Sequence, residues 1–146
     1  MKKILFSAMA LAMLGIFSGC SKDDDDDAVC TLSETSIKGT YKMTAWTITV
    51  APAPAVDYFN LGLDACDRDD TYTLGDNGVY TLTDAGTQCT PAESDTGTWM
   101  LTGTTLSVDA ASTEDIDGTV TNFGCNGFSV TFDLGGGVNT MTFVRQ

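Results

Sequence analysis

Three pairs of short apolar segments constrain the fold most strongly, because each pair has the pattern of a β-hairpin with one apolar face. In the first pair the connecting loop is 76–78, and its glycine suits the left-handed position of a three-residue turn. Leu74 then faces Tyr80, and Tyr72 faces Leu82. Other loop lengths scatter these four residues over both faces. The turn residues and the apolar alternation therefore predict the same register.

The second and third pairs repeat this pattern around turns that also contain glycine. A Gly103-Thr104 turn is expected in the second hairpin and a Gly136-Gly137 turn in the third. The facing pairs that follow are Leu101 with Leu106, Trp99 with Val108, Phe132 with Met141, and Val130 with Phe143. Threonine and serine dominate the opposite face, as in a sheet with one buried side.

Further strands are expected on either side of these hairpins. Residues 38–50 read as a long first strand whose alternation slips by one residue near Ala45, which predicts a bulge or sharp bend there. Residues 117–123 supply another strand before Asn126-Gly127, which is a strong turn pair.

Two other segments have weaker patterns. Residues 30–37 are expected to contain a short helical turn, because Thr31 and Glu34 have capping-box spacing. Residues 56–63 are either an edge strand or a loop. About eight strands thus follow one another through short turns, which predicts an all-β, antiparallel up-and-down meander. Closure into a barrel buries the apolar face and removes exposed edges, and a β-sandwich is the alternative.

An eight-stranded barrel is either just filled by its own side chains or holds one small ligand. The residues expected to line the interior, as core or as ligand contacts, are Tyr72, Leu74, Tyr80, Leu82, Trp99, Leu101, Phe132 and Phe143.

The start of the chain has the layout of a signal peptide. Residues 1–19 contain two lysines, an apolar run too short for a membrane span and a final Ser-Gly pair. The small residues before Cys20 resemble the lipobox of bacterial lipoproteins, in which the cysteine becomes residue one and is acylated, for example with palmitate. The resemblance implies a lipid anchor on Cys20 that holds the protein at a membrane. An ordinary secretory signal is the alternative.

Residues 20–27 contain five consecutive aspartates, which predict an extended, solvated tether. The run also resembles the acidic export tag that follows the acylated cysteine in one large group of Gram-negative bacteria. That resemblance implies the outer membrane, with exposure on the cell surface, and the periplasmic face is the alternative. Residues 28–146 have the size of one domain.

Four cysteines, Cys30, Cys66, Cys89 and Cys125, follow the tether. Export implies an oxidising compartment, so two disulfides are expected, with three connectivities to choose from. Extending the register of the first hairpin brings Cys66 within one residue of Cys89, so these two are expected to pair and to contribute about 3 kcal/mol. By elimination Cys30 pairs with Cys125. No metal is expected, because these thiols lack Cys-x-x-Cys spacing and histidine partners.

Charge and composition argue against several functions. The formal charge is −13 at pH 7 and becomes about −15 without the leader, which excludes nucleic acid as a partner. Histidine is absent, so the commonest general base is missing and an enzyme is not expected. The sequence contains two acidic clusters, which are Asp64, Asp67, Asp69 and Asp70, and Glu114, Asp115 and Asp117. Both are interpreted as solvated loop carboxylates, and the second cluster does not match the EF-hand pattern.

The order of the motifs resembles the lipocalin-like domain of bacterial surface lipoproteins. The motifs are Gly39-Thr40-Tyr41, 64–70 leading into Tyr72, Asp76-Asn77-Gly78, Cys89, Gly97-Thr98-Trp99, 101–106 and 141–145. The resemblance implies a barrel of about eight strands with one open mouth, and brings no catalytic residue and no cofactor.

The expected function is that of a membrane-anchored lipoprotein whose barrel binds a small apolar ligand. The alternative is a non-enzymatic structural or interaction module of a cell-surface complex, with protein partners that the sequence does not identify. A solvent-connected apolar cavity favours the first function, and a filled interior favours the second.

Overall fold

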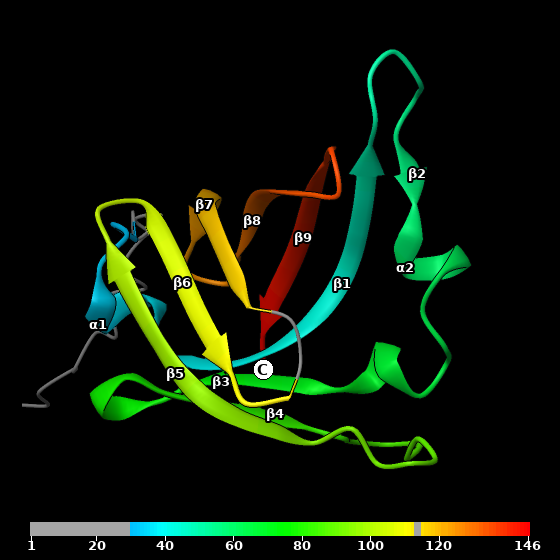
Figure 1. The fold of residues 1–146 in the computed structure, drawn as a ribbon. Helices are drawn as coiled ribbons and strands as arrows, with labels where there is room; N and C mark the ends of the chain where they lie inside the picture. Colours follow the sequence, from blue (N-terminus) through cyan, green and yellow to red (C-terminus); the bar gives the residue numbers. More distant parts are fainter. Residues whose placement is uncertain (1–29, 113–114) are drawn as a thin grey trace, which may run out of the picture.

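The chain folds into an antiparallel β-barrel, seen in a computed structural model that describes residues 30–112 and 115–146 (Figure 1). The predicted leader, the Cys20 anchor, the acidic tether and Glu114 lie outside the described residues. The helices and strands are α1 (Glu34–Ile37), β1 (Gly39–Thr49), β2 (Val56–Asp57), α2 (Tyr58–Leu61), β3 (Thr71–Leu74), β4 (Val79–Thr83), β5 (Asp95–Thr102), β6 (Thr105–Ala110), β7 (Ile116–Gly124), β8 (Gly127–Leu134) and β9 (Gly137–Arg145). Two 3₁₀ turns, η1 (Asp67–Asp69) and η2 (Asp76–Gly78), lie before and after β3.

Eight strands close the barrel, and one further strand flanks it. β1 pairs with β3, each strand from β3 to β9 pairs with the next, and β9 pairs back with β1. β2 is a two-residue addition along the end of β1. The predicted all-β up-and-down barrel is confirmed, and the sandwich is not adopted, because pairing of the first and last strands closes the sheet.

Two of the predicted hairpin registers are confirmed. Leu74 pairs with Tyr80 across a loop in which Gly78 has a φ of 71°. Trp99 pairs with Val108 around Gly103, which also has a positive φ. The predicted irregularity in β1 is present as a register shift between Met43 and Ala45 against β9.

The predicted register of the third hairpin is wrong. The turn is Gly135-Gly136, both with positive φ, so Val130 pairs with Met141 and not with Phe143. Phe128 takes the place opposite Phe143, and Phe132 pairs with Asn139, not with Met141.

The predicted Asn126-Gly127 turn is shifted as well. Gly127 already belongs to β8 and pairs with Gly124 across the turn. A Cβ on Gly127 would clash with the Phe143 carbonyl oxygen. This glycine therefore allows a close approach of β8 to β9 and does not form the turn.

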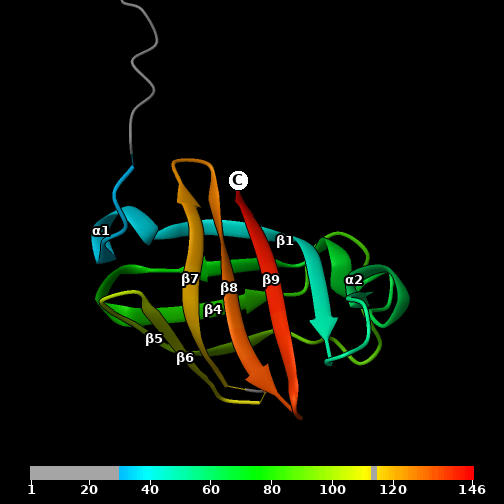
Figure 2. The same ribbon diagram turned by 90° about the horizontal axis from the view of Figure 1, so that it is seen from above.

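The two ends of the barrel differ, and α1 and α2 lie at opposite ends (Figure 2). At the closed end α1 places the fully buried Ile37 against the core. The predicted helical turn is present, but its capping box joins Ser33 and Ser36 instead of Thr31 and Glu34. At the other end, which we call the mouth, 56–63 forms both a short edge strand, β2, and the single-turn helix α2.

Each end carries one disulfide. Cys30 is joined to Cys125 beside the β7–β8 turn, and Cys66 is joined to Cys89 at the mouth. These are the two pairings expected from the sequence. Within the described part of the chain, no helix is both long enough and apolar enough to cross a membrane.

Candidate functional site

The closed end of the barrel is filled by its own side chains. The rings of Tyr41, Phe128 and Phe143 pack against one another there, edge-to-face and tilted, with centroids 5.0 and 5.3 Å apart. A residual void of about 30 Å³ lies among these rings, which is the share of liquid volume of one water molecule. No ligand larger than water fits there.

Arg145 at the end of β9 fastens α1 over this closed end. Its guanidinium donates to the carbonyl oxygens of Ser36 and Lys38, both at 2.6 Å, and to the Tyr41 hydroxyl at 2.7 Å. The guanidinium carbon also lies 5.0 Å from the centre of the Tyr41 ring. The Tyr41 hydroxyl in turn donates a hydrogen bond to the Ile37 carbonyl oxygen at 2.6 Å. Buried polar groups here satisfy one another, which stabilises the closure.

The mouth contains a cavity of about 260 Å³ that we call the mouth cavity. Its walls are formed by apolar side chains from most of the strands and by four carboxylates. The apolar lining residues are Met43, Trp46, Leu63, Leu82, Val108, Ile116, Phe132, Leu134 and Met141. Tyr72 and Tyr80 form part of its inner wall, and Asp67, Asp70, Glu93 and Asp115 supply the carboxylates. Glu93, Leu134 and Asp115 are exposed, so the mouth cavity opens to solvent.

The alternation of side chains along the strand explains why Asp70 and Tyr72 line the mouth cavity. Asp70, just before β3, and Tyr72 and Leu74 occupy alternate positions and point to the same inner face. On the neighbouring strand the same face carries Tyr80 and Leu82. The carboxylate of Asp70 therefore projects into the barrel above two apolar layers, although its residue type predicts a solvated position.

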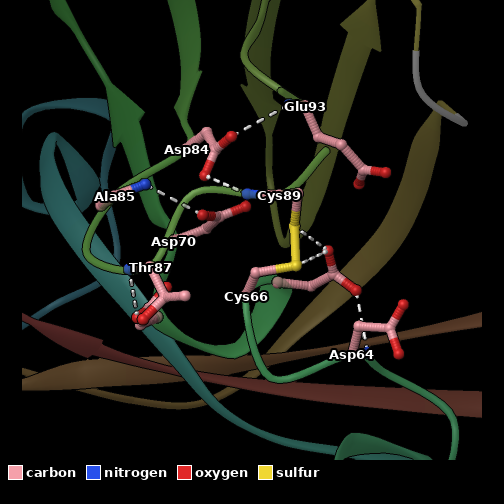
Figure 3. Close-up of a disulfide and its surroundings, with 10 residues drawn as sticks. Asp64, Cys66, Asp70, Asp84, Ala85, Thr87, Cys89 and Glu93 are labelled. Carbon is pink, nitrogen blue, oxygen red and sulfur yellow. Dashed lines mark hydrogen bonds between the residues drawn. A yellow bond between two sulfur atoms is a disulfide. The ribbon is translucent and has the colours of Figure 1, made fainter. Parts of the chain in front are cut away.

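Three carboxylates at this end, those of Asp69, Asp70 and Asp84, hold the loop between β4 and β5 in place (Figure 3). Asp84 accepts from the backbone amides of Cys89 and Glu93 at 3.3 Å each. Asp69 accepts from the Thr87 amide at 2.9 Å, and Asp70 accepts from the Ala85 amide at 3.1 Å. The interpretation of this cluster as freely solvated is thus too simple, because several of its members order a loop.

Asp67 lies against the disulfide at the mouth. Its Oδ1 is 3.0 Å from Cys89 Sγ, and its Oδ2 accepts from the Asp64 amide at 3.0 Å. These three residues, Cys66, Asp67 and Cys89, are close enough to suggest a metal site. However, the sulfurs are joined to each other and are not thiolates, so this cluster does not supply the ligands that a metal requires.

The hydroxyl groups of Tyr72 and Tyr80 form no hydrogen bond with any described residue, although Tyr80 is only 5% exposed. Burial, with the nearby Asp95 and Asp70 carboxylates, raises the pKa of Tyr80 to about 12. Burial likewise raises the pKa of Tyr72, with further contributions from Tyr80 and Asp70. Both hydroxyls therefore stay neutral at physiological pH and keep unused hydrogen-bonding capacity.

All eight residues expected as core or as ligand contacts belong to the hydrophobic core or pack against it, and six of them border a cavity. Tyr72, Leu74, Tyr80, Leu82, Phe132 and Phe143 border the inner void or the mouth cavity. The other two, Trp99 and Leu101, border neither. Leu101 packs against the core near the closed end, and Trp99 is buried with its indole nitrogen donating to the Gly75 carbonyl at 2.9 Å.

The lining residues that the sequence did not predict include Asp70 and Trp46. Asp70 continues the alternation of Tyr72 and Leu74 by one step, so the strand pattern contained a signal for it. Trp46 is brought to the mouth by the bulge in β1, and its indole nitrogen donates to Asn139 Oδ1 at 2.9 Å. That contact depends on the β1–β9 register, which the hairpin patterns did not predict.

Comparison with protein families gives a match to the lipocalin-like domain over residues 37–130. The matched region begins at the end of α1 and ends within β8, so it includes the disulfide at the mouth and most of the lining residues. No match was found among curated proteins or among solved structures. Because the family match covers more than half of the sequence and the fold is the expected closed barrel, the chain belongs to the lipocalin-like domain family.

Proposed function

We propose that the protein is a non-enzymatic binding protein that holds a small, largely apolar molecule in the mouth cavity. The single observation that carries this proposal is the mouth cavity of about 260 Å³, open to solvent and walled mainly by apolar side chains. Small-molecule sites are typically concave, mostly apolar and supplied with a few polar groups that orient the ligand. The mouth cavity has all three properties.

The dimensions limit the ligand. At roughly 30 Å³ for each water-sized group, the mouth cavity accommodates about nine non-hydrogen atoms. The packed aromatic rings of the closed end prevent a longer molecule from entering further. A short alkyl chain or a single ring system with a polar group therefore fits, and a long-chain lipid would extend into solvent.

Native mass spectrometry of residues 28–146, secreted into an oxidising compartment and purified gently, tests this proposal. We expect an extra mass in the native spectrum that disappears on denaturation. Leu82→Phe reduces the volume of the mouth cavity and should remove the extra mass. Leu101→Phe makes the same change outside the mouth cavity and should retain it. A native mass equal to that of the bare chain with two disulfides, also after exposure to apolar metabolites, would favour the interaction-module alternative.

We also propose that a lipid anchor on Cys20 tethers the barrel by its closed end to the outer membrane, on the cell surface. The lipobox and the aspartate run support the anchor and its location. The Cys30–Cys125 disulfide supports the orientation, because it fixes the start of the described chain beside the β7–β8 turn. The mouth then faces away from the membrane, where it can meet dissolved ligands.

Two cell-based experiments test the anchor and the location separately. Cys20→Ser should release the protein from the membrane fraction, and unchanged membrane retention would contradict acylation. Protease treatment of intact cells should remove the domain. Protection of the domain, with cleavage only after the outer membrane is opened, would instead support the periplasmic alternative.

A further inference from the structure

The mouth cavity combines an apolar wall with negative charge that has no cationic partner among the described residues. Four carboxylates line it, and the described lysines and arginines form no ion pair with any of them. The recorded ion pairs join Lys38 to Glu34 and Asp76, at the closed end. Arg68, the nearest cation in sequence, donates instead to Asn60 Oδ1 at 3.4 Å. A charged apolar cavity without its own counter-ion favours a ligand that brings one.

Asp70 is the most deeply placed of these carboxylates, with only 3% of its surface exposed. Its Oδ1 accepts one hydrogen bond, from the Ala85 amide, which is little for a buried carboxylate with about four acceptor sites. Its inward-facing neighbour Asp84 differs, because each oxygen of that carboxylate accepts from a loop amide. Burial and the like charges of Asp84, Asp67 and Asp69 raise the pKa of Asp70. A cation beside Asp70 would relieve this unfavourable burial of charge.

Two further acceptors border the same space. Tyr72 and Tyr80 line the inner wall of the mouth cavity, and their hydroxyls have no hydrogen-bond partner among the described residues. Tyr80 is 95% buried by surface area, and the part that lines the mouth cavity is available to a ligand there. Asp70, Tyr72 and Tyr80 together offer one carboxylate and two hydroxyl oxygens at the inner wall of the apolar cavity.

We propose that the mouth cavity selects small primary amines, with the ammonium group between Asp70, Tyr72 and Tyr80 and the hydrocarbon part against the apolar wall. This inference rests on the proposed function, since it specifies the ligand class of the same cavity. A primary ammonium has three N–H donors, which match the three acceptors, and its charge offsets that of Asp70. Asp67, Glu93 and Asp115, nearer the rim, add attraction during approach.

Isothermal titration calorimetry with three probes of equal chain length separates this inference from the proposed function. Octylammonium, 1-octanol and octanoate have similar hydrocarbon parts and carry positive, zero and negative charge. The titrations use residues 28–146 at about 150 mM salt, where long-range attraction is screened beyond about 8 Å. We expect octylammonium to bind at least tenfold more tightly than 1-octanol, and octanoate to bind more weakly than both.

Three variants identify the groups responsible. Asp70→Asn should weaken octylammonium binding at least tenfold and leave 1-octanol binding within twofold. Tyr80→Phe should weaken octylammonium binding several-fold. Asp133→Asn is the matched control, because it removes the same charge from an exposed residue at the same end of the barrel that does not line the mouth cavity. It should change octylammonium binding by less than twofold.

Each outcome has a distinct meaning. Equal binding of octylammonium and 1-octanol would overturn amine selection while the apolar-ligand proposal stands. Equal losses in Asp70→Asn and Asp133→Asn would also overturn it, because they would reveal attraction to overall charge. Binding of none of the three probes would overturn both proposals. Circular dichroism of each variant confirms that the barrel is folded before its affinity is interpreted.

Discussion

At the scale of single residues, Arg145 stabilises the closed end of the barrel. Its guanidinium makes three hydrogen bonds that join the end of β9 to α1 and to β1. We expect Arg145→Met to lower the free energy of unfolding by about 3 kcal/mol, because it leaves two carbonyl oxygens and the Tyr41 hydroxyl without this donor. Arg145→Lys should recover only part of the loss, since an ammonium cannot reproduce the planar fork.

Urea denaturation followed by circular dichroism measures these differences. Lys42→Met is a suitable control, because it removes a positive charge from β1 without a recorded hydrogen bond or ion pair. A loss for Arg145→Met no larger than that for Lys42→Met would contradict the structural role of Arg145.

Asp70 provides a second residue-scale prediction, concerning pH. Because its pKa in the folded state is raised, the folded state binds the Asp70 proton more readily than the unfolded state does. The associated stability is therefore present below the ordinary carboxyl pKa of about 3.9 and is lost as pH rises through the folded pKa. We expect Asp70→Asn to be more stable than the natural protein at pH 7.

This stability difference should shrink as pH falls towards about 4, where Asp70 becomes protonated in both states. Urea midpoints for the two proteins measured between pH 4 and 8 test this, since other acid effects are shared by the pair. A difference that stays constant over the whole range would contradict a raised pKa.

The inward orientation of the Asp70 side chain could not be predicted from its residue type. Aspartate near a turn ordinarily predicts a solvated position, whereas here the alternation of β3 carries it to the inner face. The apolar residues Tyr72, Leu74, Tyr80 and Leu82 were predictable, because burial and alternation agree for them. Polar lining residues were not, because strand pattern and residue type favour opposite faces.

At the scale of the elements, the Cys66–Cys89 disulfide joins the segment before β3 to the loop before β5. Replacing both cysteines by serine should lower the free energy of unfolding by about 3 kcal/mol, as expected from loop closure over a sequence separation of 23. Urea denaturation of the double variant beside the oxidised natural protein measures the loss. A double variant as stable as the natural protein would contradict this contribution.

The β8–β9 turn gives another prediction at this scale. Gly135 has a φ of 61°, which suits asparagine but not a β-branched residue. We expect Gly135→Asn to keep the free energy of unfolding within about 0.5 kcal/mol and Gly135→Val to reduce it by about 1–2 kcal/mol. In the Gly136-Gly137 register, residue 135 would instead belong to the strand and valine would be tolerated. Equal stability of the two variants would thus contradict the observed turn.

The same hairpin explains why one register was mispredicted. Three consecutive glycines, 135–137, give no side chain to fix the turn, and the two registers differ by two residues along β8. A two-residue shift keeps every side chain on its face, so the apolar alternation cannot distinguish them. The first hairpin was predictable because its alternative loops would have moved apolar residues to the wrong face.

At the scale of the whole molecule, the barrel has one filled end and one open end. The filled end carries α1, Arg145 and the Cys30–Cys125 disulfide, and the open end carries the mouth cavity. Strand order and closure were predictable, because successive hairpins with one apolar face have few ways to bury it. Which end stays open was not, because it depends on how α1 and the aromatic rings pack in three dimensions.

Two-dimensional ¹H–¹⁵N NMR of residues 28–146 during titration with 1-octanol tests the central claim, a ligand site at the mouth, most directly. We expect saturable shifts of one-to-one stoichiometry in amides around the mouth cavity, including those of Leu82, Phe132 and Met141, with little change near Ile37. Shifts that never saturate, or that centre on the closed end, would contradict a binding cavity at the mouth.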